Sequence, residues 1–245
     1  MADSLDFPYP RRRLIRGLVS KITRAIFSVI SDFRVIDPEN FPKEGPLLVV
    51  SNHFSFLDPV AMVSIAPWPI EFVGGFRVPN APPMVGWLRH LWGYYPVYRG
   101  TGSQTAFRAT QAILAQQGIM GIFPEGTSAH QFLRPPRPGA AFMAVRSRTR
   151  ILPVGMSGLT DVFPTLRRGR RAHVKIRVGK PFGPFEAPGR GRQRRERLNE
   201  IGDEIMRRIA NLLPAHERGH YSDDPAVLDA VKSVDFYPWD EEPEG

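Results

Sequence analysis

The 245-residue sequence contains no cysteine. This absence excludes disulfide bonds, thiolate metal sites and a cysteine nucleophile, and it fits a reducing compartment. The sequence also lacks a G-x-S-x-G elbow, an H-E-x-x-H zinc motif and a Walker A loop. Elbow-type serine hydrolases, zinc metallopeptidases and P-loop nucleotidases therefore have no support.

Long apolar runs are missing as well. No stretch approaches the roughly 20 apolar residues that a membrane span requires, and the first residues do not predict a signal peptide. At 42% hydrophobic and 23% charged residues, the composition is typical of an ordinary globular chain that is long enough to bury a substantial core. One domain is the simplest expectation.

Acidic residues are scarce except at the C-terminal end. The net charge is +9, yet residues 221–245 carry eight acids and one lysine, so residues 1–220 hold 32 basic and 16 acidic side chains, a net +16. A body of this sign attracts nucleic acid, an anionic membrane surface or phosphorylated ligands. The acidic tail is expected to be poorly ordered or to lie on the surface.

Residues 14–30 place apolar side chains at helical spacing. Arg16, Lys21 and Arg24 lie on the other side, and Arg11–Arg13 precede the pattern. The segment is predicted to be a basic amphipathic helix. Such a helix either packs its apolar side on the core or lies in a membrane interface with its arginines among lipid head groups. The pattern leaves both alternatives open.

Extended and helical patterns alternate along the rest of the chain. This alternation predicts a single three-layer α/β domain with a mostly parallel central sheet flanked by helices, plus the N-terminal amphipathic helix. We divide the chain into a membrane-associating N-terminal segment (1–34), the domain (35–220) and the acidic tail (221–245). The predicted strands are 47–50, 70–74, 94–98, 118–123, 151–156 and 174–178; the predicted helices begin at Asp58 and cover 84–92, 103–116, 139–148 and 194–213.

His53 and Asp58 stand five residues apart in "SNHFSFLDP" (51–59), directly after the apolar run Leu47–Val50. The run predicts a buried strand, and Asp58-Pro59 predicts an N-cap followed by proline at the first helical position. The carboxylate can then reach back to one ring nitrogen and leave the other as a general base. The alternative is a loop histidine beside a helix-capping aspartate.

Two further clusters follow predicted strands. "GIFPEGTSAH" (121–130) supplies Glu125, Gly126 and Thr127, and "YPVYRG" (95–100) supplies Arg99. Because the carboxyl ends of parallel strands face the ligand crevice, we expect these groups to meet the histidine–aspartate pair there. Each cluster taken alone is also compatible with a turn or a solvated cation.

Together these blocks resemble the glycerol-phosphate/lysophosphatidate acyltransferase family over about residues 45–180. "NHFSFLD" (52–58) resembles its NHxxxxD block, "GYYPVYRG" (93–100) its arginine block, "FPEGTS" (123–128) its FPEGT block and "ILPVGMSG" (151–158) its proline block. The resemblance implies that His53 is the general base and that Asp58 orients its imidazole. It further implies that Arg99 binds the acceptor phosphate, while Glu125, Gly126 and Thr127 shape the acceptor site.

Two departures from the family pattern bear on the acceptor. Ser128 stands where the commonest lysophosphatidate-specific form has arginine, and Arg134 or Arg137 in "RPPRPGAAFMA" is the candidate replacement. Tyr95–Tyr98 occupy positions where many members carry aliphatic residues and an acid. The resemblance therefore defines the reaction more closely than the acceptor, and another lysophospholipid or a glycolipid remains open.

The sequence thus predicts a peripheral or monotopic O-acyltransferase at the cytoplasmic face of a membrane. It would move a fatty acyl group from acyl-CoA or acyl carrier protein to a hydroxyl of lysophosphatidate or a related lysophospholipid, with no metal and no cofactor beyond the thioester co-substrate. The alternatives are a catalytically silent lipid-binding scaffold, a covalent route through Ser51 or Ser55, and a nucleic-acid binder. Charge alone suggests the last, and no recognisable nucleic-acid module accompanies it.

Overall fold

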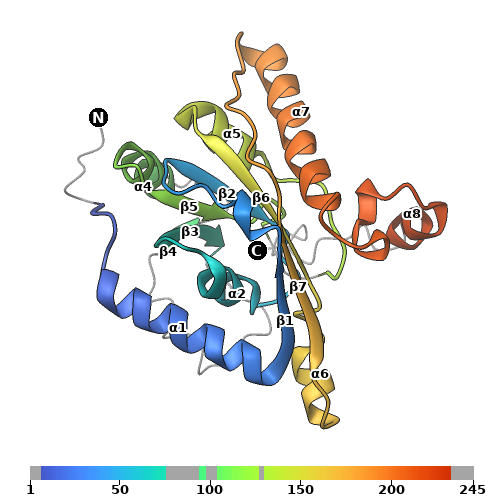
Figure 1. The fold of residues 1–245 in the computed structure, drawn as a ribbon. Coiled ribbons are helices and arrows are strands. Elements are labelled where there is room, and N and C mark those ends of the chain that lie inside the picture. The colour runs from blue at the N-terminus through green and yellow to red at the C-terminus, as the bar shows by residue number, and fades with distance from the viewer. Residues whose placement is uncertain (1–6, 76–93, 98–103, 127–129, 233–245) are drawn as a thin grey trace, which may run out of the picture.

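The computed structural model describes residues 7–75, 94–97, 104–126 and 130–232. These residues form a seven-stranded sheet in the order β1-β7-β6-β2-β5-β3-β4, with helices on both of its faces (Figure 1). Neighbouring strands are parallel except β6 and β7, which are antiparallel. The strands are β1 (Ser31–Ile36), β2 (Leu47–Ser51), β3 (Ile70–Gly75), β4 (Tyr94–Val97), β5 (Ile119–Ile122), β6 (Arg150–Ser157) and β7 (Ala172–Val178).

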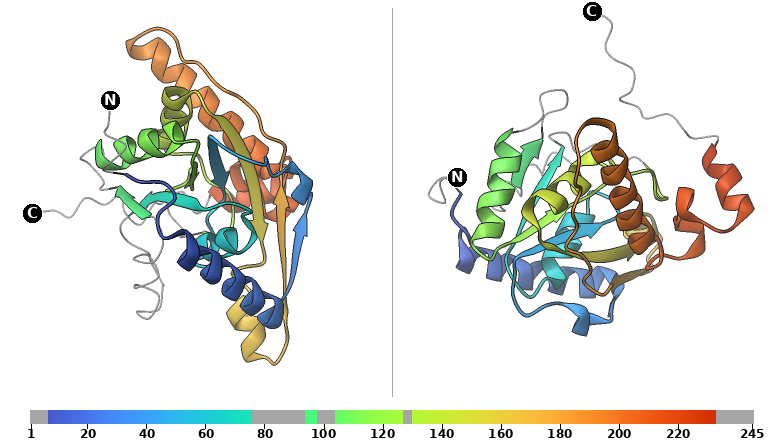
Figure 2. Two further views of the ribbon diagram at one scale, coloured as in Figure 1. Left: turned by 60° about the vertical axis from the view of Figure 1, so that its left-hand side comes forward. Right: turned by 90° about the horizontal axis from the view of Figure 1, so that it is seen from above.

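Helices cover both faces of the sheet (Figure 2), and a hydrophobic core lies on each face. One core joins the sheet to α4, α5 and α7, and the other joins it to α1 and α2. The three-layer α/β fold predicted from the sequence is therefore confirmed. The helices are α1 (Arg13–Ile30), α2 (Asp58–Ile65), α4 (Gln104–Ala115), α5 (Pro138–Ser147), α6 (Val162–Arg167), α7 (Gly191–Ala210) and α8 (Pro225–Lys232).

Strand β2 shows why the central strands read as continuous apolar runs. Leu48 and Val50 point into the core beneath α4, α5 and α7, whereas Leu47 and Val49 point into the core beneath α1 and α2. Successive side chains of a strand alternate between faces, so a strand covered on both sides needs apolar residues at every position. Five consecutive residues of β2 are buried.

Most predicted elements occur within two residues of their expected bounds, and α7 differs more, since it begins at Gly191 and ends at Ala210. Among the described residues, the sequence did not predict strand β1, helices α6 and α8, or the short 3-10 helices Pro38–Asn40, Ala215–Glu217 and Gly219–Tyr221. Strand β1 follows α1 without an intervening turn and pairs with β7, which lies far away in the sequence. No local sequence pattern indicates this pairing. The predicted helix over residues 84–92 lies outside the described residues.

The N-terminal helix α1 packs on α2 with its less apolar side. Arg16, Thr23 and Phe27 are buried, and the Ser20 hydroxyl donates to the Val63 carbonyl at 2.9 Å. The apolar side of α1 faces outward instead. The structure therefore does not adopt the alternative in which this side packs on the core. The exposed apolar residues of α1 are Leu14, Ile15, Leu18, Ile22, Ile26 and Val29.

Candidate active site

The site begins where β2 ends and α2 starts. His53 lies in the turn after β2, and Asp58 is the first residue of α2. His53 Nδ1 lies 2.9 Å from Asp58 Oδ2. A carboxylate can only accept, so Nδ1 donates and Nε2 keeps its lone pair. The Asp58 side chain is 1% exposed and that of His53 17% exposed, so the pair is shielded while the ring keeps an open edge.

Asp58 differs in detail from the expected N-cap. Leu57 is the N-cap of α2, and the Asp58 carboxylate points back toward the preceding turn. Its Oδ2 accepts the backbone N–H groups of Phe54 at 2.7 Å and Ser55 at 2.8 Å. These donors hold a buried anion in place where an apolar surrounding would disfavour it. One carboxylate thus fixes both the turn and the imidazole.

Asn52 and Phe123 complete the surroundings of the histidine. Asn52 exchanges two hydrogen bonds of 2.8 Å with the Met156 backbone, which ties the end of β2 to β6. The ring of Phe123, just after β5, stacks on His53 at 4.2 Å between centroids. Both residues belong to the sequence motifs, but neither was predicted to have a role; their positions directly after buried strands were the available signal.

Glu125 connects the histidine turn to the loop that follows β5. The residue is 2% exposed; its Oε1 accepts the His53 N–H at 2.9 Å, and its Oε2 accepts the Arg134 N–H at 3.2 Å. Burial is the largest influence on this carboxyl and raises its pKa to about 8, against the lowering effect of the two N–H donors. The residue therefore acts as a buried brace between two loops.

Gly126 allows the chain to turn immediately after this brace. Its φ is +72°, a left-handed conformation that L side chains rarely adopt, and a Cβ there would lie 3.2 Å from Arg137 Cγ. The Arg137 N–H donates to the Pro124 carbonyl at 2.8 Å, while its side chain is exposed at the start of α5. Gly126 and Arg137 therefore lie side by side at the edge of the site.

The two candidate replacements for the missing arginine lie in different surroundings. Arg134 is 2% exposed, and its Nη1 lies 2.6 Å from His130 Nε2. Burial first and the Arg134 charge second lower the pKa of His130, which favours the neutral imidazole beside the guanidinium. Arg137 is the solvent-facing cation of the two. Arg99 and Thr127 lie outside the described residues.

The structure thus brings His53, Asp58, Glu125 and Gly126 together at the carboxyl ends of two paired parallel strands, β2 and β5. A base supported by a buried carboxylate suits proton abstraction from a hydroxyl. Within the described ranges, no cluster of three or more histidine, aspartate or glutamate side chains could hold a metal ion. The fold and these residues define an α/β protein with a buried histidine–carboxylate pair at its sheet edge.

Comparison with known proteins places the chain among acyltransferases. The model of the Acyltransferase family matches residues 32–157, more than half of the sequence. The chain belongs to this family. Its similarity to a 1-acyl-sn-glycerol-3-phosphate acyltransferase of Bacillus subtilis is 22% identity over 190 residues, which cover 77% of this chain and 92% of that protein.

A human relative and a solved structure extend the comparison. The chain is 30% identical to human 1-acyl-sn-glycerol-3-phosphate acyltransferase alpha over 153 residues, which cover 58% of this chain and 52% of that protein. The chain thus spans about half the length of the plant and mammalian relatives it matches. The crystal structure of a 1-acyl-sn-glycerophosphate acyltransferase from Thermotoga maritima superposes with a TM-score of 0.55 at 21% identity, over 78% of this chain and 76% of that one. This likeness confirms the fold.

Proposed function

We propose that the protein is a membrane-peripheral O-acyltransferase. It transfers a fatty acyl group from acyl-CoA or acyl carrier protein to a hydroxyl of lysophosphatidate or a related lysophospholipid. The observation that carries the proposal is the buried Asp58 carboxylate, which orients the His53 ring at the sheet edge. The match to the Acyltransferase family over residues 32–157 supports the same reaction.

The proposed reaction uses His53 Nε2 as the base. The acceptor hydroxyl oxygen attacks the thioester carbonyl as its proton passes to Nε2, so the C–O bond forms and the C–S bond then breaks. The imidazolium, stabilised by Asp58, returns the proton to the departing thiolate. General-base assistance of this kind contributes about 10²- to 10⁴-fold. Arg99, Arg137 and Thr127 are proposed to bind the acceptor head group, with Glu125 and Gly126 shaping the loop that presents it.

Helix α1 is proposed to hold this site at the membrane surface. Its outward stripe includes Leu14 at 90%, Leu18 at 61% and Val29 at 72% exposure, and Lys21 and Arg24 are exposed beside the stripe. An apolar stripe flanked by cations suits the boundary between acyl chains and head groups. The described part of the chain contains no helix of the length and apolarity needed to traverse a bilayer.

The experiment that tests the catalytic proposal is thiol release from palmitoyl-CoA with a colorimetric thiol reagent. Lysophosphatidate, glycerol 3-phosphate and uncharged or zwitterionic lysophospholipids are offered in turn, and acyl carrier protein serves as the second donor. The cysteine-free chain contributes no thiol background. We expect acceptor-dependent release that falls at least 10²-fold in His53→Ala, because the base is lost.

His173→Ala provides the matched control. His173 Nδ1 lies 3.0 Å from Asp32 Oδ2, but its side chain is 80% exposed on the surface, so its removal should leave release unchanged. No release from the wild type with any acceptor and either donor would favour the silent lipid-binding scaffold. Equal losses in both variants would contradict the role of His53.

A further inference from the structure

A second cationic and apolar surface lies on α6 and the turn that follows it. We call residues Val162–Arg171 the basic hairpin; its arginines are Arg167, Arg168, Arg170 and Arg171. All four are exposed, and within the described part of the chain Arg167, Arg168 and Arg170 form no ion pair. Four cations in five residues without partnering acids create a local positive field.

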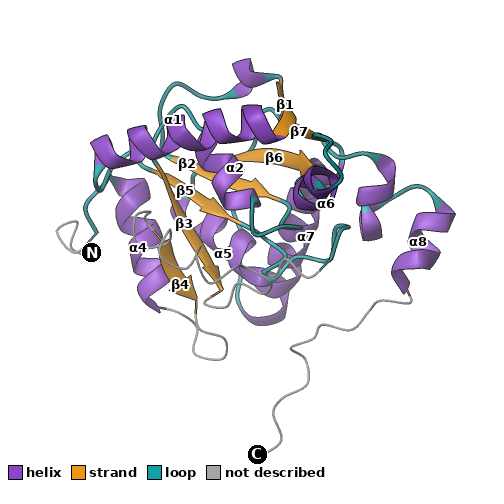
Figure 3. Ribbon diagram, turned by 90° about the horizontal axis from the view of Figure 1, so that it is seen from below, coloured by secondary structure: helices purple, strands orange, loops and turns teal. Residues whose placement is uncertain are grey.

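The basic hairpin is attached to the C-terminal end of α1. Arg171 Nη2 donates to the carbonyls of Ser28 and Ser31, the last turn and C-cap of that helix. Helix α1 has no basic residue in its own last turn, so Arg171 supplies the cation that a helix C-terminus favours. Figures 1 and 3 both show α6 beyond the C-terminal end of α1. The hairpin therefore lies next to the C-terminal end of α1.

Apolar side chains accompany the cations on both elements. Phe163 is 41% and Leu166 42% exposed on α6, and the Phe163 ring stacks on Phe56 at 5.8 Å between centroids. Phe56 belongs to the turn between His53 and Asp58. Exposed apolar side chains therefore occur on both α1 and the hairpin, and the hairpin also contacts the turn that carries the candidate base.

From this arrangement we infer that the basic hairpin is a second membrane contact that recognises anionic lipid head groups. The inference deepens the proposed peripheral location and rests on it. Arg167, Arg168 and Arg170 lie among the head groups, while Leu166 and Phe163 enter the interface beside the stripe of α1. An acidic carrier protein would also satisfy the arginines, but exposed Phe163 and Leu166 next to an apolar helix favour a lipid surface.

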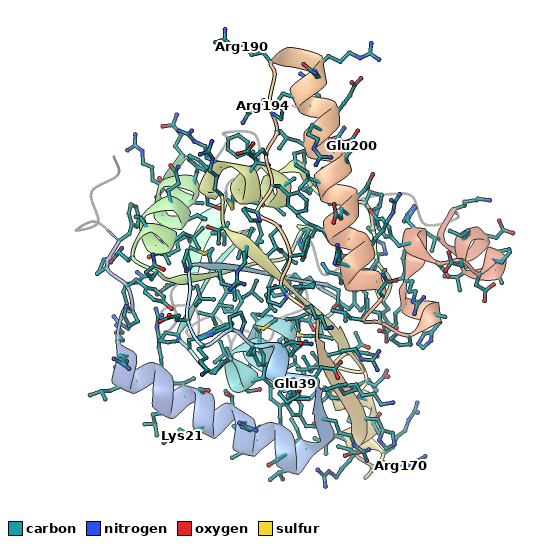
Figure 4. The ribbon with its side chains drawn as sticks, turned by 45° about the horizontal axis from the view of Figure 1, so that its top comes forward. Lys21, Glu39, Arg170, Arg190, Arg194 and Glu200 are labelled. Carbon is teal, nitrogen blue, oxygen red and sulfur yellow. The ribbon has the colours of Figure 1, made fainter. Side chains whose placement is uncertain are left out.

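The test compares triple variants that remove equal charge from opposite ends of the molecule. R167Q/R168Q/R170Q removes three cations of the hairpin and keeps Arg171, whose hydrogen bonds attach the hairpin to the end of α1. R190Q/R192Q/R195Q removes three exposed cations near the start of α7; Figure 4 shows Arg190 at the far end of the molecule from Arg170. Binding of the full chain to vesicles is measured by flotation, with phosphatidylcholine alone and with about one quarter phosphatidylglycerol added.

We expect the wild type to bind the phosphatidylglycerol vesicles more tightly, with a preference that weakens in high salt. Each arginine near an anionic surface contributes about fivefold, so the hairpin variant should lose on the order of 100-fold of that preference. Binding to phosphatidylcholine, which depends on α1, and thiol release in uncharged detergent micelles should stay unchanged. The α7 variant should resemble the wild type.

Three outcomes would overturn the inference. If both triple variants had the same preference for phosphatidylglycerol vesicles, the hairpin would not contact the membrane, whereas the membrane role of α1 would be unaffected. Wild-type chain that floats with neither vesicle would contradict the peripheral location as well. Unchanged flotation of the hairpin variant, with slower thiol release only when acyl carrier protein is the donor, would assign the arginines to a protein donor instead.

Discussion

Two histidine–aspartate pairs in this chain have nearly the same nitrogen–oxygen distance, 2.9 Å for His53–Asp58 and 3.0 Å for His173–Asp32. They differ in burial. Hydrogen bonds from His173 first and Arg34 second lower the pKa of the exposed Asp32 carboxyl, and solvent screens that pair. Asp58 is 1% exposed and accepts two backbone N–H groups. Burial and a fixed turn, rather than distance, distinguish the candidate catalytic pair.

Also at the scale of single residues, the buried Glu125 predicts a pH dependence of stability. Burial raises its pKa from 4.5 to about 8, so the folded state binds this proton more tightly than the unfolded chain. The contribution of Glu125 to the free energy of unfolding is therefore favourable at low pH and is lost as the pH rises from about 4.5 to about 8. We expect the free energy of unfolding to fall by a few kcal/mol (order of magnitude) across this window.

Urea unfolding of the wild type and of Glu125→Gln at a series of pH values checks this expectation. Glutamine does not titrate, so the variant should show a flatter dependence over the same window, although it loses one acceptor for a backbone N–H. Glu200→Gln on the exposed side of α7, labelled in Figure 4, should keep the wild-type slope. Parallel curves for wild type and Glu125→Gln would show that the buried carboxyl titrates normally.

At the scale of elements, a buried ion cluster decides how α1 docks. Glu71 of β3 is fully buried; its Oε1 lies 2.6 Å from Arg16 Nη1 and its Oε2 lies 3.1 Å from Arg11 Nη2. Arg11 also lies over the Tyr95 ring at 4.7 Å. Because Arg16 must reach Glu71, the opposite side of α1 faces outward with its apolar stripe. The carboxylate on β3 therefore sets the orientation of the proposed membrane anchor.

Glu71→Ala should consequently loosen α1. Removing one member of a buried ion cluster leaves uncompensated charge and costs about 3–5 kcal/mol. Urea unfolding measures the loss, and faster tryptic cleavage after Lys21 and Arg24 would locate it in α1. Arg34→Ala, which breaks an exposed pair with Asp32, should cost no more than about 0.5 kcal/mol. A similarly small loss for Glu71→Ala would refute the docking role.

A second element-scale feature holds the loop that follows Glu125. The Leu133 N–H donates to the Glu217 carbonyl at 2.9 Å, and the His220 N–H donates to the Leu133 carbonyl at 3.2 Å. Gly219, between them, has a φ of +51°, and a Cβ there would lie 2.1 Å from the Leu133 oxygen. The segment after α7 thus clamps the loop that leads to Arg134 and Arg137.

Gly219→Ala should break this clamp. The backbone contact adds about 1–3 kcal/mol of overpacking to the left-handed strain, and displacement of the loop should raise the KM for the proposed lysophospholipid acceptor more than it lowers kcat. Gly169→Ala is the control, because Gly169 also has a positive φ, +68°, but nothing lies within 4 Å of its added Cβ. If both variants lost the same stability and kept the same KM, the clamp would be dispensable.

At the scale of the whole molecule, the outward stripe of α1 predicts how the protein meets a bilayer. Leu18→Ser/Ile22→Ser removes two side chains that are 61% and 49% exposed. Each apolar side chain contributes about 1.5–3 kcal/mol when buried, so flotation with phosphatidylcholine vesicles should weaken by at least about 100-fold.

The free energy of unfolding of the same variant should change by less than about 0.5 kcal/mol per site, because surface substitutions rarely affect stability. Thiol release in detergent micelles should also persist. Retained flotation of the double variant would show that α1 is not the anchor, whatever the catalytic activity proves to be.

Much of the architecture could be predicted because its signals are local. Apolar runs such as Leu47–Val50 are strands buried on both faces, and the turn from His53 to Asp58 is set by short-range hydrogen bonds. Elements that depend on distant partners were missed. Strand β1 exists through its pairing with β7, and the proposed boundary at residue 34 falls inside it. Helix α8 lies within the segment predicted as an acidic tail.

The sequence by itself determined the alternation of strands and helices, the candidate base with its carboxylate partner, and the amphipathic character of α1, since each follows from residues close together in the chain. Only the tertiary structure decided which side of α1 faces outward, that Glu125 braces the His53 turn, and that Arg171 joins the basic hairpin to α1. These contacts join residues at least 50 positions apart. Side-chain periodicity describes one element at a time, whereas such contacts depend on how the elements pack together.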